Sequence, residues 1–378
     1  MSKHTLSIAG IFRALSPKSA KPAAKKSQAS KSMVIDQLEG RQLMTVGPAT
    51  IANATVNDAV HEVSTGDLHV TYFNNSNKTL NYQQFHDDGT AEASVQIDAG
   101  SDTGQFQSLV EDSNGVLHVA YYDGVNGDLK YARRETNGTW TTSIIESKNT
   151  VGLYPSIAID ASGRPAVAYY AKTGGNLKLA TFDGSAWTTT LLDTTNDVGR
   201  YPSLGLNPTT NRLGVAYEDS TVGHFKYAEL NANGSVSVIT VDPNTKAGGG
   251  YISLNFQGGN PGFSYYDAFN ADLKFAERSS KGKWSVTTVA AKGSQGLYTD
   301  LQYTYNTNQP AIVYFNKTND ALTLAYRNVD GSWGYEVEAT GGGRNASAVD
   351  GPSINGSVPD LFLVYTDTAT GSLKVETI

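Results

Sequence analysis

The chain of 378 residues contains no cysteine, and its three methionines all lie within the first 44 residues. Without thiols the protein has no disulfide and no thiolate ligand for zinc, and with six histidines in the whole chain a zinc site is not expected. A body without oxidisable sulfur is compatible with a location outside the cell. No segment approaches the roughly 20 apolar residues that a membrane helix needs, so we expect no membrane insertion.

Recognisable catalytic and nucleotide-binding motifs are also missing. The sequence has no Gly-x-Ser-x-Gly elbow, no P-loop and no His-Glu-x-x-His pair. An Asp-x-Asp-x-Asp run, which would favour calcium, is absent as well. We therefore predict no catalytic residue, no metal ligand and no cofactor. Calcium binding at an Asp-rich loop is an alternative that no motif in the sequence favours.

Charge is divided unevenly along the chain. Residues 1–44 hold eight basic and two acidic side chains, a net charge of +6; the whole chain carries −7, so the remainder carries −13. Lys, Ser, Ala and Pro dominate the basic segment, which favours a disordered targeting or linker segment over residues 1–42 and a folded body over residues 43–378. An acidic body disfavours nucleic acid, whose phosphates prefer a basic surface.

Glycine and tyrosine, by contrast, are abundant, with 38 and 21 residues. Short runs of β-branched and aromatic residues alternate with Gly, Asn and Asp turns, a pattern typical of an all-β chain. One segment recurs: residues 118–132 match residues 166–180 closely, and residues 214–228, 262–276 and 311–325 nearly as well. A period near 48 residues indicates a propeller or a solenoid.

A column of tyrosines marks seven copies of this unit. Successive members are 48 to 51 residues apart: Tyr72, Tyr121, Tyr169, Tyr217, Tyr265, Tyr314 and Tyr365. Periodic aromatic residues usually belong to a core, so we assign this column to packing between repeats. The lysines that follow it in most units are expected to be solvated or ion-paired.

Each unit predicts four strands. The first opens on a Tyr/Phe-x-Ser pattern, the second ends at the tyrosine column, and the third is Asp-Leu-Lys-Tyr-Ala or its equivalent. The fourth begins after an Asn-Gly or Asp-Gly turn, for example at Trp140, and these dipeptides favour hairpins because both central positions accept a positive φ. The second strand is apolar on both faces, as expected for sheets stacked around an axis. The sequence thus predicts a seven-bladed β-propeller of four-stranded antiparallel blades.

Ring closure adds a further expectation. The seventh unit stops after its third strand, at residues 374–378. Counting back from the first unit places the missing strand near residues 43–53, so we expect an N-terminal strand to close the last blade. Pro48 fits there, because an outer edge strand tolerates a residue that donates no ladder hydrogen bond.

The repeat Tyr-Tyr-Asp-x-x-x-Gly-Asp-Leu-Lys-Tyr-Ala, best seen at residues 121–132, resembles repeats of secreted bacterial β-propellers of the sialidase-like and lectin-like kind. The resemblance covers about residues 55–378. The Gly turns before Trp140 and Trp187 resemble degenerate sialidase Asp-boxes, and residues 38–44 resemble a Leu-Glu-x-Arg-x-Leu motif near the N-terminus of exported proteins. The resemblance implies a location outside the cell or on its surface.

In a propeller, the blade-to-blade loops and the loops between second and third strands open on one face. The first group carries aromatic residues that can stack on sugar rings: Tyr154, Tyr201, Tyr251 and Tyr298. The second begins with acids that can bond sugar hydroxyls: Asp123, Asp219, Asp267 and Asp367. Binding sites combine apolar walls with a few placed polar groups. The structural alternative is that each Asp caps its own turn and each Tyr packs beside its strand.

Residues that break the repeat are additional ligand candidates. Glu218 replaces the second aromatic of its unit, His224 replaces an Asp or Asn, and Arg200 and Arg344 lie in blade-to-blade loops. Adjacent strand residues point to opposite faces, so Glu218 and Asp219 do not form a carboxylate pair. The arginines show no recognisable sialidase arrangement.

These observations favour a monomeric propeller, outside the cell or on its surface, that binds a glycan or another cell-envelope component and has no catalytic activity. One alternative is a sialidase-like glycoside hydrolase or a polysaccharide lyase. Another is a protein-interaction scaffold at the cell envelope. The fold by itself does not separate them, because function depends on the site that a fold presents.

Overall fold

The computed structural model of the protein describes residues 54–62, 65–86, 90–304, 307–350, 361–367, 370 and 372–377. The chain divides into two compact units, Met1–Arg41 and Gln42–Ile378, and all described residues belong to the second. The predicted basic linker and the predicted closing strand at residues 43–53 lie outside the described residues. Within those residues there is no helix long and apolar enough to cross a bilayer.

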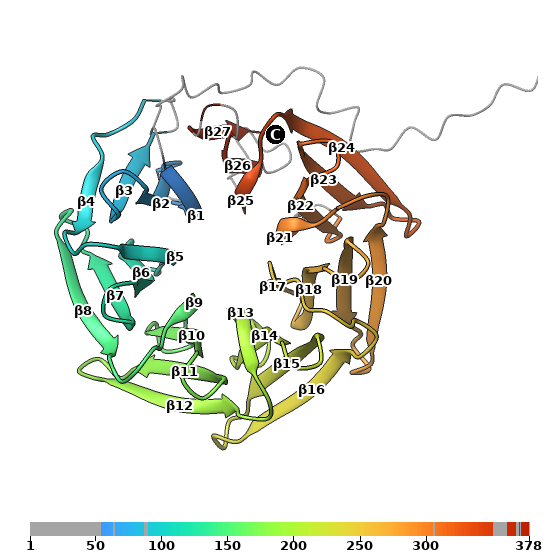
Figure 1. Ribbon diagram of the computed structural model, residues 1–378, viewed down its shortest axis with the longest axis horizontal. Helices are drawn as coiled ribbons and strands as arrows, with labels where there is room; N and C mark the ends of the chain where they lie inside the picture. The colour runs from blue at the N-terminus through green and yellow to red at the C-terminus, as the bar shows by residue number, and fades with distance from the viewer. Residues whose placement is uncertain are drawn as a thin grey trace, which may run out of the picture. The chain divides into compact units, whose positions relative to one another are not determined.

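Seven antiparallel sheets, numbered here in chain order, make up the second unit. Figure 1 shows them around a central axis, with the first strand of each sheet innermost. The innermost strands are β1 (Ala54–His61), β5 (Thr103–Glu111), β9 (Leu153–Ile159), β13 (Val198–Leu206), β17 (Ser253–Gln257), β21 (Leu297–Tyr303) and β25 (Arg344–Asp350). The second strands are β2 (Leu68–Asn74), β6 (Leu117–Asp123), β10 (Pro165–Ala171), β14 (Leu213–Asp219), β18 (Asn260–Asp267), β22 (Pro310–Asn316) and β26 (Leu361–Thr366).

The outer half of each sheet follows the same order. The third strands are β3 (Thr79–Phe85), β7 (Asp128–Arg134), β11 (Asn176–Phe182), β15 (His224–Leu230), β19 (Asp272–Arg278), β23 (Ala321–Arg327) and β27 (Leu373–Thr377). The fourth strands are β4 (Val95–Asp98), β8 (Trp140–Glu146), β12 (Trp187–Asp193), β16 (Val236–Asp242), β20 (Trp284–Ala290) and β24 (Trp333–Thr340). The chain is therefore an all-β propeller with four-stranded antiparallel blades.

The prediction of seven four-stranded blades is wrong for the last repeat. The structure has six four-stranded blades, and the seventh sheet, β25–β27, has three strands. β27 is the last described strand, and the segment that we expected to complete this sheet lies outside the described residues. The seventh sheet packs against the first through β25 and β1.

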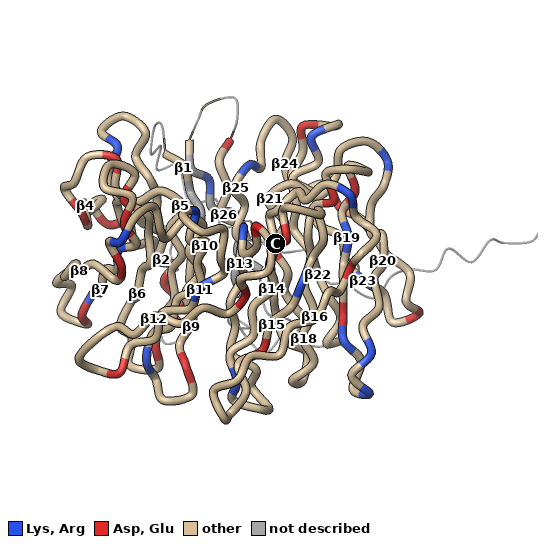
Figure 2. The backbone as a smooth tube through the Cα atoms, turned by 60° about the horizontal axis from the view of Figure 1, so that its bottom comes forward, with Lys and Arg blue, Asp and Glu red and all other residues tan. Residues whose placement is uncertain are grey.

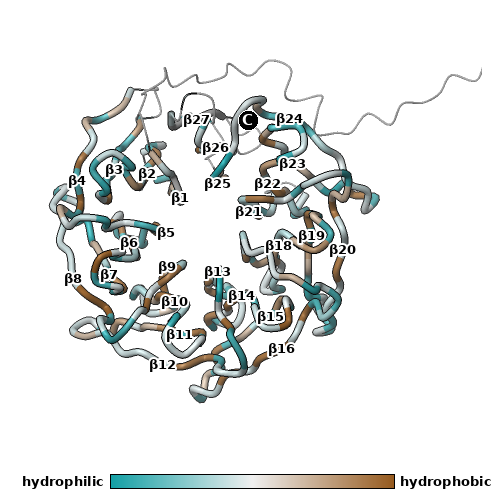
Figure 3. The backbone as a smooth tube through the Cα atoms, in the orientation of Figure 1, coloured by the Kyte–Doolittle hydropathy of each residue, from teal (hydrophilic) through white to brown (hydrophobic). Residues whose placement is uncertain are grey.

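The tyrosine column is confirmed as packing between sheets. All seven tyrosines are at most 2% exposed, and their strands are buried on both faces. Figure 3 shows hydrophobic stretches within strands such as β7, β19 and β21, with hydrophilic colour in many connecting turns. Figure 2 shows the charged residues mostly at strand ends and in loops.

A buried polar triad joins neighbouring sheets. Tyr217 on β14 donates a hydrogen bond to Asp193 at the end of β12 at 2.7 Å, and Lys226 on β15 pairs with the same carboxylate at 2.5 Å. The predicted lysine column is therefore ion-paired. The other triads have the same geometry: Tyr121, Asp98 and Lys130; Tyr169, Glu146 and Lys178; Tyr265, Asp242 and Lys274. Each satisfies a carboxylate that would be costly to bury alone.

The innermost strands are linked by side chains that accept backbone hydrogen bonds from the next sheet. The Leu204 amide donates to Ser156 Oγ at 2.9 Å, and the Leu254 amide donates to Ser203 Oγ at 2.9 Å. This serine is the last residue of the Tyr/Phe-x-Ser pattern. The pattern therefore supplies the side chains that connect neighbouring innermost strands around the axis. The first and sixth sheets have Asp58 and Asp300 in its place.

Candidate ligand-binding face

One end of the sheets carries both groups of predicted loops. There each innermost strand begins and each second strand ends: Thr103 pairs with Asp123, and Val198 pairs with Asp219. The blade-to-blade connections and the turns between second and third strands therefore open together. We call this end the connection face.

Five aromatic side chains follow one another around the axis at this face. They occupy the same position on β5, β9, β13, the connection before β17, and β21: Phe106, Tyr154, Tyr201, Tyr251 and Tyr298. Successive ring centroids are 4.6, 4.3, 5.9 and 4.4 Å apart. These are the separations of interacting aromatic rings. All five side chains are half-buried. The five rings form one continuous surface, which we call the aromatic arc.

The backbone of the arc is strained. All five aromatic residues are left-handed, with φ between 49° and 54°. A bulky residue in this region is an outlier that costs roughly 1–3 kcal/mol, and such strain concentrates at functional sites. A bulge accompanies it on β13, where the pairing with β14 shifts between Arg200 and Ser203. The structure thus maintains, in five consecutive sheets, a conformation that glycine would adopt at lower cost.

A glycine two residues before the aromatic makes this approach possible. At Gly199, φ is 97°, and a Cβ there would lie 2.6 Å from the Leu177 Cα atom of the preceding sheet. Gly104, before Phe106, meets Leu80 in the same way at 2.5 Å. The repeated Gly-x-Tyr sequence therefore brings each connection close against the preceding sheet.

The tyrosine hydroxyls of the arc contact one another in pairs. Tyr201 is hydrogen-bonded to Tyr154, and Tyr251 is hydrogen-bonded to Tyr298. Burial, together with these phenolic neighbours, raises the pKa of Tyr201 and Tyr251 above that of a free phenol. Both hydroxyls therefore stay neutral at physiological pH and act as hydrogen-bonding groups.

Glu218 lies beneath this arc. Its carboxyl is 6% exposed and accepts a hydrogen bond from Ser220 Oγ at 2.9 Å. A Cβ at Gly248 would lie 1.9 Å from Glu218 Oε1, so the glycine-rich connection packs directly on the carboxyl. Burial raises the pKa of Glu218, and the nearby Arg200 opposes that rise.

Arg200 and Arg344 occupy one repeat position, between the left-handed glycine and the arc position. The Arg200 guanidinium lies 5.4 Å from the Tyr170 ring centroid and donates to Asp197 at 2.7 Å. The Arg344 guanidinium lies 5.8 Å from the Phe315 ring centroid, and its side chain is exposed. His224 is farther out, half-buried at the start of β15 opposite Asp219.

The predicted Asp column is buried and bonds within its own turns. Asp123 accepts from the Val125 and Asn126 amides at 3.1 Å, and Asp267 accepts from the Phe269 amide at 3.1 Å. Asp219 and Asp367 accept in the same manner from the Thr221 and Thr370 amides. These four residues are at most 9% exposed. All four cap their turns, and Asp267 and Asp367 also pair with Lys274 at 2.9 Å and Lys374 at 2.7 Å.

Two kinds of residue escaped the sequence prediction. Phe106 belongs to the aromatic arc, and its Phe-x-Ser pattern was the signal that could have placed it there. Asp58 and Asp300 replace serines near the axis, and the signal was the same departure from the repeat that selected Glu218. Burial raises the pKa of Asp58 to about 7, and Asp300 adds to that rise.

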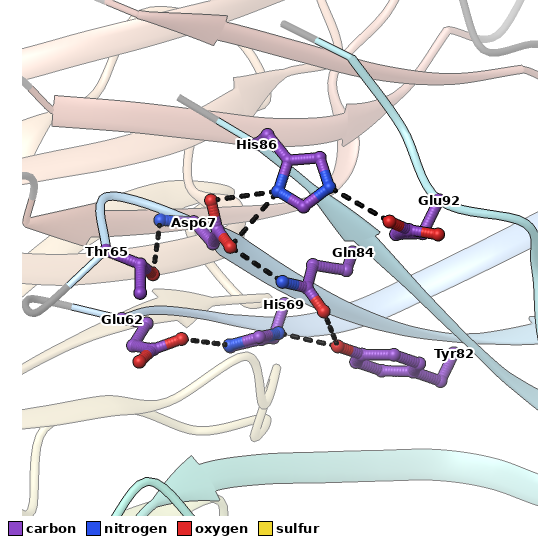
Figure 4. Close-up of polar contacts among 8 residues, drawn as sticks. All are labelled: Glu62, Thr65, Asp67, His69, Tyr82, Gln84, His86 and Glu92. Atoms are coloured by element: carbon purple, nitrogen blue, oxygen red, sulfur yellow. Dashed lines mark hydrogen bonds and ion pairs between the residues drawn. The ribbon is translucent and has the colours of Figure 1, made fainter. Parts of the chain in front are cut away.

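A second polar cluster lies at the opposite end of the first sheet. Figure 4 shows its members: Glu62, Thr65, Asp67, His69, Tyr82, Gln84, His86 and Glu92. His86 Nδ1 lies 3.1 Å from Asp67 Oδ1, and His86 Nε2 lies 3.2 Å from Glu92 Oε1. These two carboxylates, Glu92 first, raise the pKa of His86.

The buried part of this cluster recurs in the next sheet. His69 Nδ1 lies 2.6 Å from Tyr82 Oη, and His118 Nδ1 lies 2.6 Å from Tyr131 Oη. All four side chains are at most 8% exposed. A repeated and buried pair of this kind stabilises its sheet, so we assign no ligand to it. In the part of the chain that the structure describes, no group of three or more His, Cys, Asp or Glu is arranged to hold a metal ion.

Comparison with known proteins agrees with the fold. No family model matches the chain, and no curated protein matches it in sequence. Among solved structures, polysaccharide lyase Uly1 is similar with a TM-score of 0.55 and 9% identity, covering 85% of this chain and 89% of that one.

Two fungal proteins are also similar in structure. A mutant of AofleA from Arthrobotrys oligospora gives a TM-score of 0.54 at 11% identity, covering 78% of this chain and 89% of that one. Aleuria aurantia lectin in complex with α-methyl-L-fucoside gives a TM-score of 0.47 at 18% identity, covering 71% and 90%. At these identities the likenesses describe the fold alone.

Proposed function

We propose that this protein is a carbohydrate-binding propeller whose ligand lies across the aromatic arc of the connection face. The observation that carries the proposal is the arc itself, which repeats a strained backbone in five sheets and keeps five half-buried rings in contact. Sugar rings present apolar C–H faces that pack on aromatic rings, while their hydroxyls need polar partners. The neutral phenols of Tyr201 and Tyr251 are partners of that kind.

The arrangement supports one extended site better than several separate ones. Adjacent rings lie at most 5.9 Å apart between Phe106 and Tyr298, so neighbouring sugar units of one chain would meet one surface. The acidic column is already bonded to its own turns. We therefore assign recognition to the arc and the two arginines of the connection face, with the buried Glu218 packed behind them.

Glycan binding with paired variants tests this proposal. A broad glycan array finds the ligand, and titration calorimetry then compares the chain with Tyr201→Ala and with Tyr335→Ala. Tyr335 is 49% exposed on an outermost strand, so it controls for the loss of an accessible tyrosine. We expect Tyr201→Ala to weaken binding at least tenfold and Tyr335→Ala to leave it unchanged. Silence across the array would overturn the proposal.

Polysaccharide cleavage is the second candidate, favoured by one observation. Glu218 is a buried carboxyl with a raised pKa beside the arc, which is the usual state of a general acid. Against this, a glycosidase needs two carboxyls across the substrate, and the raised pKa values of Tyr201 and Tyr251 make these phenols poor bases. Product analysis after incubation with polysaccharides separates cleavage from binding.

We propose in addition that the protein works outside the cell or on its surface as a monomer. The lack of cysteine and of methionine after residue 44 supports an exposed location. The three strands of the seventh sheet continue the order of the other sheets, and its innermost strand contacts β1 and β21.

A further inference from the structure

The aromatic arc ends at the seventh sheet, where polar residues replace the repeat. Asn345 stands at the arc position, with the same left-handed backbone at φ 51°. Thr366 stands where other sheets have Tyr122 or Phe315, and it is the strand partner of Arg344. Three side chains of different chemistry, cationic, amide and hydroxyl, therefore follow directly after the last ring of the arc.

Arg200 provides an internal template for this sector. At the same repeat position in the fourth sheet, the guanidinium stacks on Tyr170 and donates to Asp197, three residues earlier in the chain. The second sheet repeats the plan with a neutral donor, because Gln105 Nε2 donates to Asp102 at 2.8 Å. In both sheets, the side chain at this position therefore donates a hydrogen bond to a carboxylate three residues earlier in the chain.

In the seventh sheet that carboxylate is replaced. Gly341 stands where Asp197 stands in the fourth sheet, three residues before the arginine. Arg344 is exposed and, within the described residues, contacts the Phe315 ring without pairing to a carboxylate. The Thr366 hydroxyl is buried and has no hydrogen-bond partner among the described residues. Within the described residues the buried Thr366 hydroxyl therefore lacks an acceptor, while the exposed Arg344 guanidinium is free to pair with a ligand.

We propose that Arg344, with Asn345 beside it, binds the carboxylate of an acidic sugar whose neighbouring units stack on the aromatic arc. The inference rests on the proposed carbohydrate function and narrows it to uronic-acid-type oligosaccharides. The guanidinium is suited to this role because its planar donors match a carboxylate, and because stacking on Phe315 holds its plane in place. The surrounding unit carries a net negative charge. The exposed, unpaired arginine is therefore a positive group on an acidic surface.

Matched oligosaccharides test the inference. The probes are a uronic acid oligomer of four to six units and the same oligomer with each carboxyl reduced to an alcohol. Titration calorimetry with the full chain at low salt should give about tenfold tighter binding of the acidic oligomer, a difference equal to one good charge-assisted contact. Added salt should narrow the gap, because it screens the ion pair.

Three variants locate the effect. Arg344→Gln should abolish the preference and leave binding of the reduced oligomer unchanged. Arg278→Gln, which removes the same charge at the far end of β19, should preserve the preference. Gly341→Asp restores the carboxylate of the fourth sheet and should compete with the ligand. Open space surrounds Gly341, and Asp is among the residues that tolerate its φ of 72°.

The outcomes distinguish the two proposals. Equal binding of both oligomers, with loss of both in Tyr201→Ala, would overturn the role of Arg344 and leave carbohydrate binding standing. A preference that survives Arg344→Gln would also overturn it. If a preference for sulfated over carboxylated oligomers replaces the expected order, the ligand class assigned here is wrong. Failure of every glycan to bind would overturn both proposals.

Discussion

Asp58 on β1 accepts a hydrogen bond from the backbone amide of Leu109 on β5, at 2.9 Å, and so ties the first sheet to the second beside the axis. Ser108 Oγ donates to the same carboxyl at 3.1 Å. The contact needs an acceptor oxygen and no negative charge. Because burial raises the pKa of Asp58 to about 7, the charged form is the costly one in the folded state.

Asp58→Asn should therefore stabilise the protein at alkaline pH. The folded state holds the Asp58 proton up to about pH 7, while the unfolded chain releases it near 3.8, so wild-type stability falls as pH rises between these values. The asparagine oxygen keeps the hydrogen bonds from Ser108 and Leu109 and carries no charge, at the cost of the bond that the second carboxyl oxygen accepts from the Ala59 amide. We expect a higher melting temperature than wild type at pH 8, and no gain at pH 3.5. A control is Asp183→Asn in an exposed hairpin, where backbone hydrogen bonds lower the pKa of the carboxyl to about 2 and no gain is expected.

Removing the carboxylate of an intersheet triad should be strongly destabilising. Asp193→Ala leaves the Lys226 ammonium and the Tyr217 hydroxyl buried without their partner, which costs roughly 3–5 kcal/mol in comparable buried pairs. Denaturant unfolding measures the change. The double variant Asp193→Leu with Lys226→Met should recover much of the loss, and failure of both variants to differ from wild type would show that the triad contributes nothing.

The strained arc reverses the usual order of substitutions in a strand. At Tyr154, φ is 52°, so glycine relieves the backbone while alanine does not. We expect Tyr154→Gly to be more stable than Tyr154→Ala by about 1 kcal/mol, although both lose the ring and any glycan affinity that depends on it. At Tyr169, whose backbone is extended in β10, the order should be the ordinary one, with alanine more stable.

Deletion of residues 43–53 tests the closing strand. If this segment completes the seventh sheet, its loss exposes β27 as an unpaired edge next to β1 and weakens the contact between first and last sheets. We expect a clearly lower melting temperature by calorimetry. Deletion of residues 2–12 from the basic segment is the matched control, and a melting point equal to wild type in both would overturn the closure.

The repeat made most of the fold predictable. A tyrosine every 48 to 51 residues, a strand apolar on both faces and a Gly turn before Trp140 define strands, hairpins and their stacking. These signals are local or periodic, so one sequence shows them. The last repeat was predicted less well, because the described residues form a three-stranded sheet there, β25–β27, where the repeat predicted four strands.

The candidate site was only partly predictable, for physical reasons. The tyrosines of the arc follow from the repeat, but their left-handed backbone and mutual ring contacts depend on how neighbouring sheets approach. The sequence left two roles open for the Asp column, ligand binding and turn capping, and Asp123 and Asp267 do bond to amides of their own turns. The proposed role of Gly341 depends on a comparison of the fourth and seventh sheets. Gly341 has no side chain at the position where the fourth sheet has a carboxylate.

The four triads also have a mechanical consequence. One triad connects each pair of neighbouring sheets from the first to the fifth. Between the fifth and sixth sheets, Ala290 occupies the position of the acid and Thr323 occupies the position of the lysine. We therefore expect thermal fluctuations to separate the fifth and sixth sheets, between β20 and β22, more readily than the sheets that a triad connects. Amide hydrogen exchange would show this as faster labelling along β22 than along β14.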